Sequence, residues 1–144
     1  MTRHEIQVLN TADGRYMAVS HNIRVYVEPQ YLEDQSDPDA HRFFWAYTIA
    51  IHNEGASTVQ LKQRYWEITD ASGASERLQG SGVIGKQPVL KPGESFQYTS
   101  GCPLNTDSGF MVGHYSMQTQ DGDIFDVDIP AFALDTPVGN RNLI

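Results

Sequence analysis

The feature that most constrains this fold is a series of short segments in which apolar and polar residues alternate. Turn signals separate these segments about every ten residues. The clearest segment is 42–53, in which Trp45, Tyr47 and Ile49 occupy every second position. A period of two is typical of a β-strand, and no window has the 3.6-residue period of a helix. Asp121-Gly122 is a typical two-residue hairpin turn. The sequence predicts an all-β fold, an immunoglobulin- or fibronectin III-like sandwich of about seven or eight antiparallel strands.

The predicted strands cover residues 21–28, 42–53, 59–69, 76–79, 95–100, 110–119 and 124–129. Pro29 and Pro130 are expected to end the first and the last of them, because proline cannot donate to a sheet. In segment 59–69, the apolar positions change parity near residues 63–65. A change of parity within one strand predicts a β-bulge there.

The composition fits one globular domain, since 144 residues with 40% hydrophobic and 19% charged content can form their own core. We expect a loosely held arm at residues 1–19, the sandwich at 20–135 and a tail at 136–144. The net charge of −8 disfavours nucleic acid and acidic membranes as partners. Cys102 is the single cysteine, and residues 1–10 lack the apolar region of a signal peptide. These features predict a cytoplasmic protein.

Residues 80–86 contain a glycine motif, Gly80-x-Gly82-x-x-Gly85-Lys86, with the spacing of dinucleotide-binding loops. Such a loop binds phosphate because it leaves a buried strand and opens a helix. Prolines at positions 88 and 92 exclude a helix here, and Val83 and Ile84 favour extended structure. We therefore expect the glycines to serve a bulge or tight turn, with phosphate binding as the less favoured interpretation.

Asp121, Asp123, Asp126 and Asp128 form the densest acidic cluster and are the candidate metal ligands. Carboxylate oxygens suit Mg²⁺ or Ca²⁺, but this spacing is not that of an EF-hand loop. Carboxylates on a strand face are usually solvated, and this is the favoured interpretation. Two histidines at positions 52 and 114 lie on predicted strands and would have to meet in space to share a metal.

Two short segments supply candidate interaction residues, namely Tyr65 with Trp66 and Gln87 with Pro88. The aromatic pair is expected to pack in the core or on a sheet face, and an exposed aromatic would be the first interface candidate. Gln87 and Pro88 end a glycine-rich segment that can adapt its shape to a partner.

Several motifs occur in an order that resembles the ApaG proteins: Tyr31-Leu-x-x-Gln35-Ser-Asp-Pro38, Tyr47-Thr-Ile-Ala-Ile51-x-Asn53, Arg64-Tyr-Trp66-x-Ile-Thr-Asp70, Gly80-x-Gly-Val-x-Gly-x-Gln-Pro-x-Leu90, Pro92-Gly-Glu-x-Phe96-x-Tyr98-x-Ser100-Gly, Gly109-x-Met111-x-Gly113-x-Tyr115-x-Met117 and Ile129-Pro-x-Phe132. The resemblance covers about residues 20–135 and implies a fibronectin III-like sandwich. One departure is Tyr65, where the family leads us to expect histidine before the tryptophan. A ligand contact at that position would differ here.

The resemblance also bears on function. ApaG proteins are associated with cobalt and magnesium homeostasis in bacteria, and ApaG domains occur in eukaryotic F-box proteins and a polymerase δ-interacting protein. It implies protein binding and supplies no catalytic residues. We therefore expect a non-enzymatic interaction module with an unidentified protein partner and no cofactor, and its oligomeric state is not predicted. The alternative is a nucleotide, pyrophosphate or divalent-cation binding protein that uses the Gly80-x-Gly82-x-x-Gly85 loop.

Overall fold

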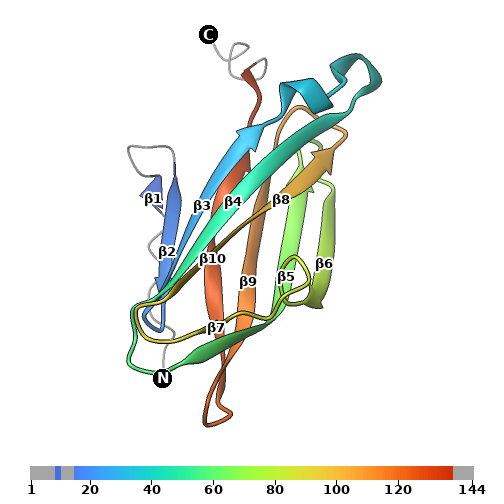
Figure 1. The fold of residues 1–144 in the computed structure, drawn as a ribbon. Coiled ribbons are helices and arrows are strands. Elements are labelled where there is room, and N and C mark those ends of the chain that lie inside the picture. The colour runs from blue at the N-terminus through green and yellow to red at the C-terminus, as the bar shows by residue number, and fades with distance from the viewer. Residues whose placement is uncertain (1–8, 11–14, 138–144) are drawn as a thin grey trace.

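The computed structural model describes residues 9–10 and 15–137, and these residues form two antiparallel sheets that face each other (Figure 1). The prediction of an all-β sandwich is confirmed. Eight strands are five residues or longer, and two more are two residues long. Among the described residues, no helix is long and apolar enough to span a bilayer.

The first sheet has the strand order β1-β2-β3-β4-β8. Its bounds are β1 (Leu9–Asn10), β2 (Tyr16–Ser20), β3 (Ile23–Tyr31), β4 (Phe43–Asn53) and β8 (Ser95–Leu104). The loop between β3 and β4 contains two 3₁₀ turns, Glu33–Gln35 and Pro38–Ala40. β4 lies between β3 and β8.

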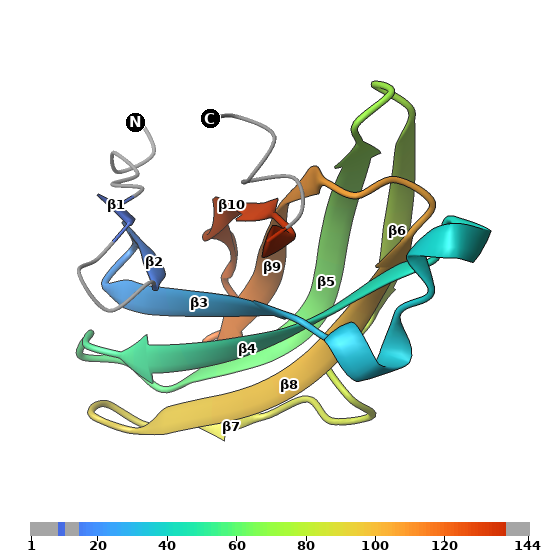
Figure 2. The same cartoon turned by 90° about the horizontal axis from the view of Figure 1, so that it is seen from above.

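The second sheet has the order β10-β9-β5-β6, and β7 pairs with the start of β5. Its bounds are β5 (Val59–Asp70), β6 (Ser75–Ser81), β7 (Val89–Leu90), β9 (Gly109–Thr119) and β10 (Ile124–Leu134). Figure 2 shows the two layers from above, with β2 and β3 next to β10. An amide of β10 also reaches β2, since the Asp128 N–H donates to Ser20 Oγ at 3.0 Å.

The core fills the space between the sheets with alternate residues of both. Trp45 of β4 and Tyr115 of β9 are among the largest fully buried side chains. Tyr115 also forms a direct link between the sheets, because its hydroxyl lies 2.5 Å from the hydroxyl of Tyr98 on β8. Each buried hydroxyl therefore satisfies the other, as buried polar groups require.

Three prolines lie inside strands, and the predicted strand ends at Pro29 and Pro130 are wrong. β3 continues through Pro29 to Tyr31, beyond the point where β2 stops pairing with it at Val27. β10 continues through Pro130 at a register shift between Ile129 and Phe132. β8 extends past its predicted end at residue 100 and includes Pro103. Proline is tolerated at these places because an edge strand or a bulge does not need every amide.

The predicted bulge in β5 exists, but it lies between Leu61 and Gln63, a little before its predicted position at residues 63–65. The extra residue is Lys62, and its carbonyl accepts the amide of Gly82 at 2.9 Å. Two residues of the glycine-rich segment therefore set the position of this bulge, Gly82 and Gln87, whose side-chain amide also donates to the Lys62 carbonyl.

The predicted N-terminal arm differs from the structure at its end. Residues 16–19 belong to β2, which pairs with β3 through the tight turn at His21 and Asn22. Both turn residues have positive φ, the conformation that a two-residue hairpin needs. Residues 1–8 and 11–14 of the arm, and residues 138–144 of the tail, lie outside the described residues.

Candidate functional site

The outward face of the second sheet presents a row of side chains, one from each strand. Gln79 of β6, Tyr65 of β5, His114 of β9 and Asp128 of β10 occupy neighbouring positions in the sheet register. The rings of Tyr65 and His114 stack, with centroids 4.5 Å apart and an angle of 19° between the planes. The register of β5 and β9 therefore produces an aromatic pair on the outside of the sandwich.

This row lines a hollow of about 470 Å³, which we call the outer hollow. Its walls include Tyr65, Glu67, Arg77, Val112 and His114. Glu67 and Arg77 face each other across β5 and β6, with an N–O distance of 3.7 Å. The outer hollow thus combines an apolar and aromatic floor with an ion pair at one side.

Two exposed apolar residues of β9 extend the outer hollow. Val112 lines it directly, and Phe110 lies two positions further along the same face, with 48% of its surface exposed. Two residues of strand rise place these side chains roughly 7 Å apart. Alternate positions of β9, at residues 111, 115 and 117, are buried, so the strand has one core face and one exposed apolar face.

The four predicted interaction residues do not lie together. Tyr65 lines the outer hollow, but Trp66 points into the core, is 5% exposed and packs edge-on against Tyr47 at 5.5 Å. Trp66 therefore offers a partner little surface, although part of the residue borders the outer hollow. Gln87 and Pro88 lie at the other end of β5, where Gln60 donates to the Gln87 carbonyl at 3.1 Å.

The glycine segment forms a tight turn, and most of its amides are occupied. The Val83 and Lys86 amides each donate to the other residue's carbonyl at 2.8 Å. The expected extended geometry fails at Ile84, which has φ +43° at the tip of this turn. The Gly82 amide donates to the β5 bulge, and a Cβ on Gly82 would lie 2.1 Å from the Lys86 carbonyl oxygen. The glycines thus serve close backbone approach, and no helix follows them to bind a phosphate.

The four candidate metal ligands are spread along the β9–β10 hairpin. Asp121 and Asp123 are exposed in its turn, and Asp126 and Asp128 share the outward face of β10. Within the described residues, no group of three or more His, Cys, Asp or Glu side chains is arranged to hold a metal ion. His52 and His114 do not meet either, because they lie on the outward faces of opposite sheets.

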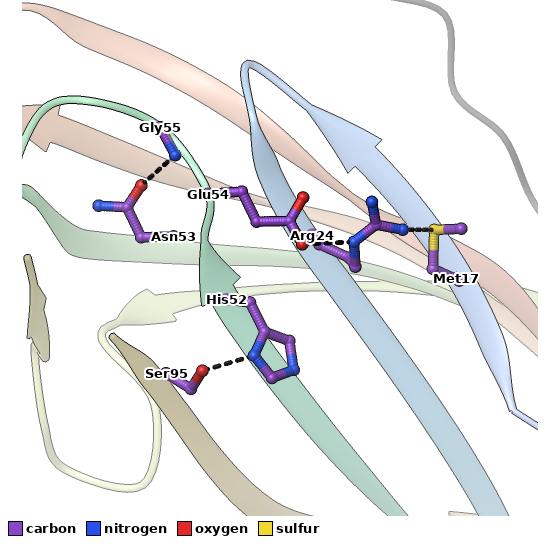
Figure 3. Close-up of polar contacts among 7 residues, drawn as sticks. All are labelled: Met17, Arg24, His52, Asn53, Glu54, Gly55 and Ser95. Atoms are coloured by element: carbon purple, nitrogen blue, oxygen red, sulfur yellow. Dashed lines mark hydrogen bonds and ion pairs between the residues drawn. The ribbon is translucent and has the colours of Figure 1, made fainter. Parts of the chain in front are cut away.

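A serine–histidine pair lies on the outward face of the first sheet, where β4 ends (Figure 3). His52 Nδ1 lies 2.5 Å from Ser95 Oγ, and the Tyr26 ring packs edge-on against the imidazole at 5.7 Å. The nearby carboxylate of Glu54 accepts from Arg24 at 2.8 Å, and this hydrogen bond lowers the pKa of Glu54. In the described part of the chain, no carboxylate is hydrogen-bonded to His52, so the pair lacks the orienting group of a catalytic triad.

Asn53, beside this pair, has a structural role. Its buried side-chain amide donates to the carbonyls of Ser57 and Leu90. Its Oδ1 atom accepts from the amide of Gly55 (Figure 3). This side chain therefore holds the β4–β5 loop against β7, and all its polar atoms have partners.

Sequence reasoning missed His114, Val112 and Phe110 as parts of one surface. The signal was present in the alternation of β9, whose outward positions carry large side chains. Their pairing with Tyr65 and Glu67 depends on the register between β5 and β9, which the sequence does not specify.

Comparisons with known proteins agree on one family. A model of the ApaG domain matches residues 33–119. A protein of Brucella anthropi called Protein ApaG is 58% identical over 128 residues, which cover 89% of this chain and 98% of that protein. A Protein ApaG of Rhodospirillum centenum is 56% identical over 86% of this chain and 95% of its own. A crystal structure described as an ApaA protein of Bordetella pertussis has 43% identity and a TM-score of 0.78, covering 80% of this chain and 94% of that one.

Proposed function

The chain belongs to the ApaG family, and we propose that it is a non-enzymatic, cytoplasmic protein-binding module whose contact surface is the outer hollow. The observation that carries the proposal is the exposed apolar and aromatic lining of that hollow on a sheet whose other face is core. Aromatic residues and arginine are enriched at protein interfaces, and both occur here in Tyr65 and Arg77.

The position of the surface also supports binding. Residues on the middle of a sheet are held by hydrogen bonds on both sides, and β5 and β9 are the two interior strands of the second sheet. Tyr65 and Val112 are therefore pre-ordered, so a partner loses little side-chain entropy in binding them. A large apolar or aromatic side chain of the partner would cover Val112, and polar groups around it would pair with Glu67 and Arg77.

Two features support a binding role over catalysis. The Ser95–His52 pair has no orienting carboxylate hydrogen-bonded to the imidazole within the described residues. Burial also raises the pKa of the Cys102 thiol to about 11, which disfavours the reactive thiolate.

The alternative of nucleotide, pyrophosphate or cation binding by the glycine loop has weaker support. The amides of Gly82, Val83 and Lys86 are already used within the protein. The ApaG family is associated with cobalt and magnesium homeostasis. We propose that this chain contributes to it by contacting a protein, and that the aspartates of the β9–β10 hairpin do not bind the metal.

Site-specific photo-crosslinking in cells tests the proposal. A photoreactive amino acid at position 112 should form a covalent adduct with a protein partner, which mass spectrometry would identify. Tyr65→Ala in the same chain should weaken binding by about 2 kcal/mol, roughly thirtyfold in affinity, as expected for an aromatic hot spot.

The matched control places the photoreactive group at Gln97, an exposed position on the outward face of the first sheet. Adducts from position 112 and none from position 97 would support the outer hollow as the interface. Equal adducts from both positions, or adducts unchanged by Tyr65→Ala, would contradict it.

A further inference from the structure

An arginine occupies an inward position of the second sheet. Beyond the bulge at Lys62, the inward residues of β5 are Arg64, Trp66 and Ile68, and the last two belong to the core. Arg64 is half-buried, and a charged group that loses part of its water is costly unless other contacts offset that loss. The inward position of the charged Arg64 therefore needs an explanation, whereas the apolar side chains of Trp66 and Ile68 do not.

The guanidinium of Arg64 is fixed by the glycine segment. Its Nη1 donates to the carbonyls of Ser81 at 3.0 Å and Gly82 at 2.9 Å. It also lies against Gly80, where an added Cβ would be 2.8 Å from its Nη2 atom. Gly80 thus leaves the space that Arg64 occupies, and Gly82 supplies one of its acceptors.

This arrangement satisfies only part of the guanidinium. Arginine has five N–H donors, and the two carbonyls engage only Nη1. In the described part of the chain, Arg64 forms no ion pair with a carboxylate. Donors on Nη2 and Nε, and the positive charge, remain for another group.

A cavity of about 200 Å³ lies beside Arg64, and we call it the Arg64 cavity. Tyr47, Tyr98 and Ser100 line it from the first sheet, and the turn at residues 83–85 covers it. Burial raises the pKa of Tyr47, whose hydroxyl forms a hydrogen bond with Ser100. The Tyr98 hydroxyl is already paired with Tyr115. One cation and the hydroxyls of Tyr47 and Ser100 therefore border a small, partly open space.

We propose that the Arg64 cavity binds a small free oxyanion of the size of inorganic phosphate. Arg64 supplies the charge, and the hydroxyls of Tyr47 and Ser100, which bond each other without a ligand, turn to donate to the oxygens. Charge-assisted hydrogen bonds of this kind are shorter and stronger than those between neutral groups. The volume of the cavity indicates a ligand smaller than a nucleotide, because pockets for ligands of drug size usually measure about 300–1,000 Å³.

The proposal gives the glycine motif a role different from that of a phosphate-binding loop. The anion would contact the guanidinium that Gly80 and Gly82 hold in place, and not the loop amides. This inference is independent of the outer hollow, which lies on the opposite face of β5.

An NMR titration with inorganic phosphate tests the proposal, with chloride at matched ionic strength as the reference. The expected result is saturable shifts of the Arg64 side-chain Nε–H signal and of the amides of Val83, Ile84 and Gly85. Titration without saturable shifts at these groups would overturn the proposal. Equal shifts with chloride would also overturn it, since they would show an effect of salt alone.

Variants separate anion binding from a change in the loop. Arg64→Gln should abolish the saturable shifts, and Arg42→Gln, at an exposed arginine in the β3–β4 loop, should leave them unchanged. Because Arg64→Gln also removes contacts to the loop, Ser100→Ala provides a second test that keeps them. It should weaken binding roughly tenfold, the cost of one hydrogen bond to a charged group. Unchanged affinity in both Arg64→Gln and Ser100→Ala would refute the site.

A third arm compares ligand sizes. Phosphate should bind at these residues more tightly than ATP, because the Arg64 cavity cannot enclose a nucleoside. Tighter binding of ATP at the same residues would contradict the size argument and identify the ligand as a nucleotide.

Discussion

Ile84 adopts a backbone conformation that its side chain disfavours. Its φ is +43°, and it is 52% exposed at the tip of the turn formed by residues 83–86. A β-branched residue in the left-handed region is a genuine outlier, because its side chain crowds the backbone. Such strain persists only where the surrounding structure holds it, and here the paired backbone of Val83 and Lys86 does so.

We expect Ile84→Asn to stabilise the protein by about 1 kcal/mol, since asparagine tolerates this conformation far better than isoleucine. Urea unfolding of the two proteins measures the difference. Ile84→Val is the control, because it keeps the β-branch and should show no gain. A loss of stability in Ile84→Asn would mean that apolar contacts of the isoleucine outweigh its backbone strain.

Neighbouring residues of one strand point to opposite faces of the sheet, so one can be exposed and the next buried. Tyr65 reaches the outer hollow and Trp66 enters the core, although the sequence gives both the same aromatic character. Which of the two faces the core depends on whether odd or even positions of β5 point inward, and the bulge at Lys62 switches the inward positions from odd to even. The sequence predicts that a switch occurs, but its position depends on hydrogen bonds from Gly82 and Gln87, which are distant along the chain.

At the scale of elements, seven of the longer strands were predictable, but β2 and the ends of several strands were not. Alternation alone locates β4 and β9 closely, because both have one buried face throughout. The ends of β3 and β10 depend on whether a proline lies at an edge, which only the pairing of strands determines. For the same reason the outer hollow, assembled from four strands, could not be predicted in full.

The glycine segment gives an element-scale prediction. Gly82→Ala should cost several kcal/mol, because the new Cβ would collide with the Lys86 carbonyl and φ is already +60°. Gly73→Ala is the matched control, since its φ is +90° but no atom lies within 4 Å of the added Cβ. Gly73→Ala should lower the free energy of unfolding by only about 1 kcal/mol, which is the cost of holding alanine at a positive φ.

Equilibrium unfolding in denaturant compares the two glycine variants. Hydrogen exchange at Val83 and Lys86 then reports whether Gly82→Ala opens the turn. Equal losses of stability in Gly82→Ala and Gly73→Ala would show that the turn moves to accept the Cβ at little cost.

At the scale of the whole molecule, the Tyr98–Tyr115 hydrogen bond joins the two sheets and makes stability depend on alkaline pH. Burial raises the pKa of both phenols above the value of about 10 for an unfolded tyrosine. The folded protein therefore holds these protons more tightly than the unfolded chain. Their contribution is complete below about pH 10 and is lost as the pH rises toward the folded pKa values.

We expect the free energy of unfolding to fall above about pH 10, with Cys102 adding a fall of the same sign from about pH 9. Urea unfolding between neutral and alkaline pH measures it. In the double variant Tyr98→Phe, Tyr115→Phe the fall should be shallower, and Cys102→Ala gives the share of the thiol. The same slope in the double variant and the unmodified chain would contradict the assignment to these tyrosines.

The prolines inside strands also affect how the molecule meets other copies of itself. Pro29, Pro103 and Pro130 each remove a donor from β3, β8 or β10, where these strands border solvent or a bulge. β6, the remaining edge of the second sheet, contains no proline and carries Glu76 and Arg77. Missing donors and charges are both barriers to strand addition and fibril growth. At high concentration the β6, β8 and β10 edges should thus resist strand addition, which favours contact with other proteins through the faces of the sandwich.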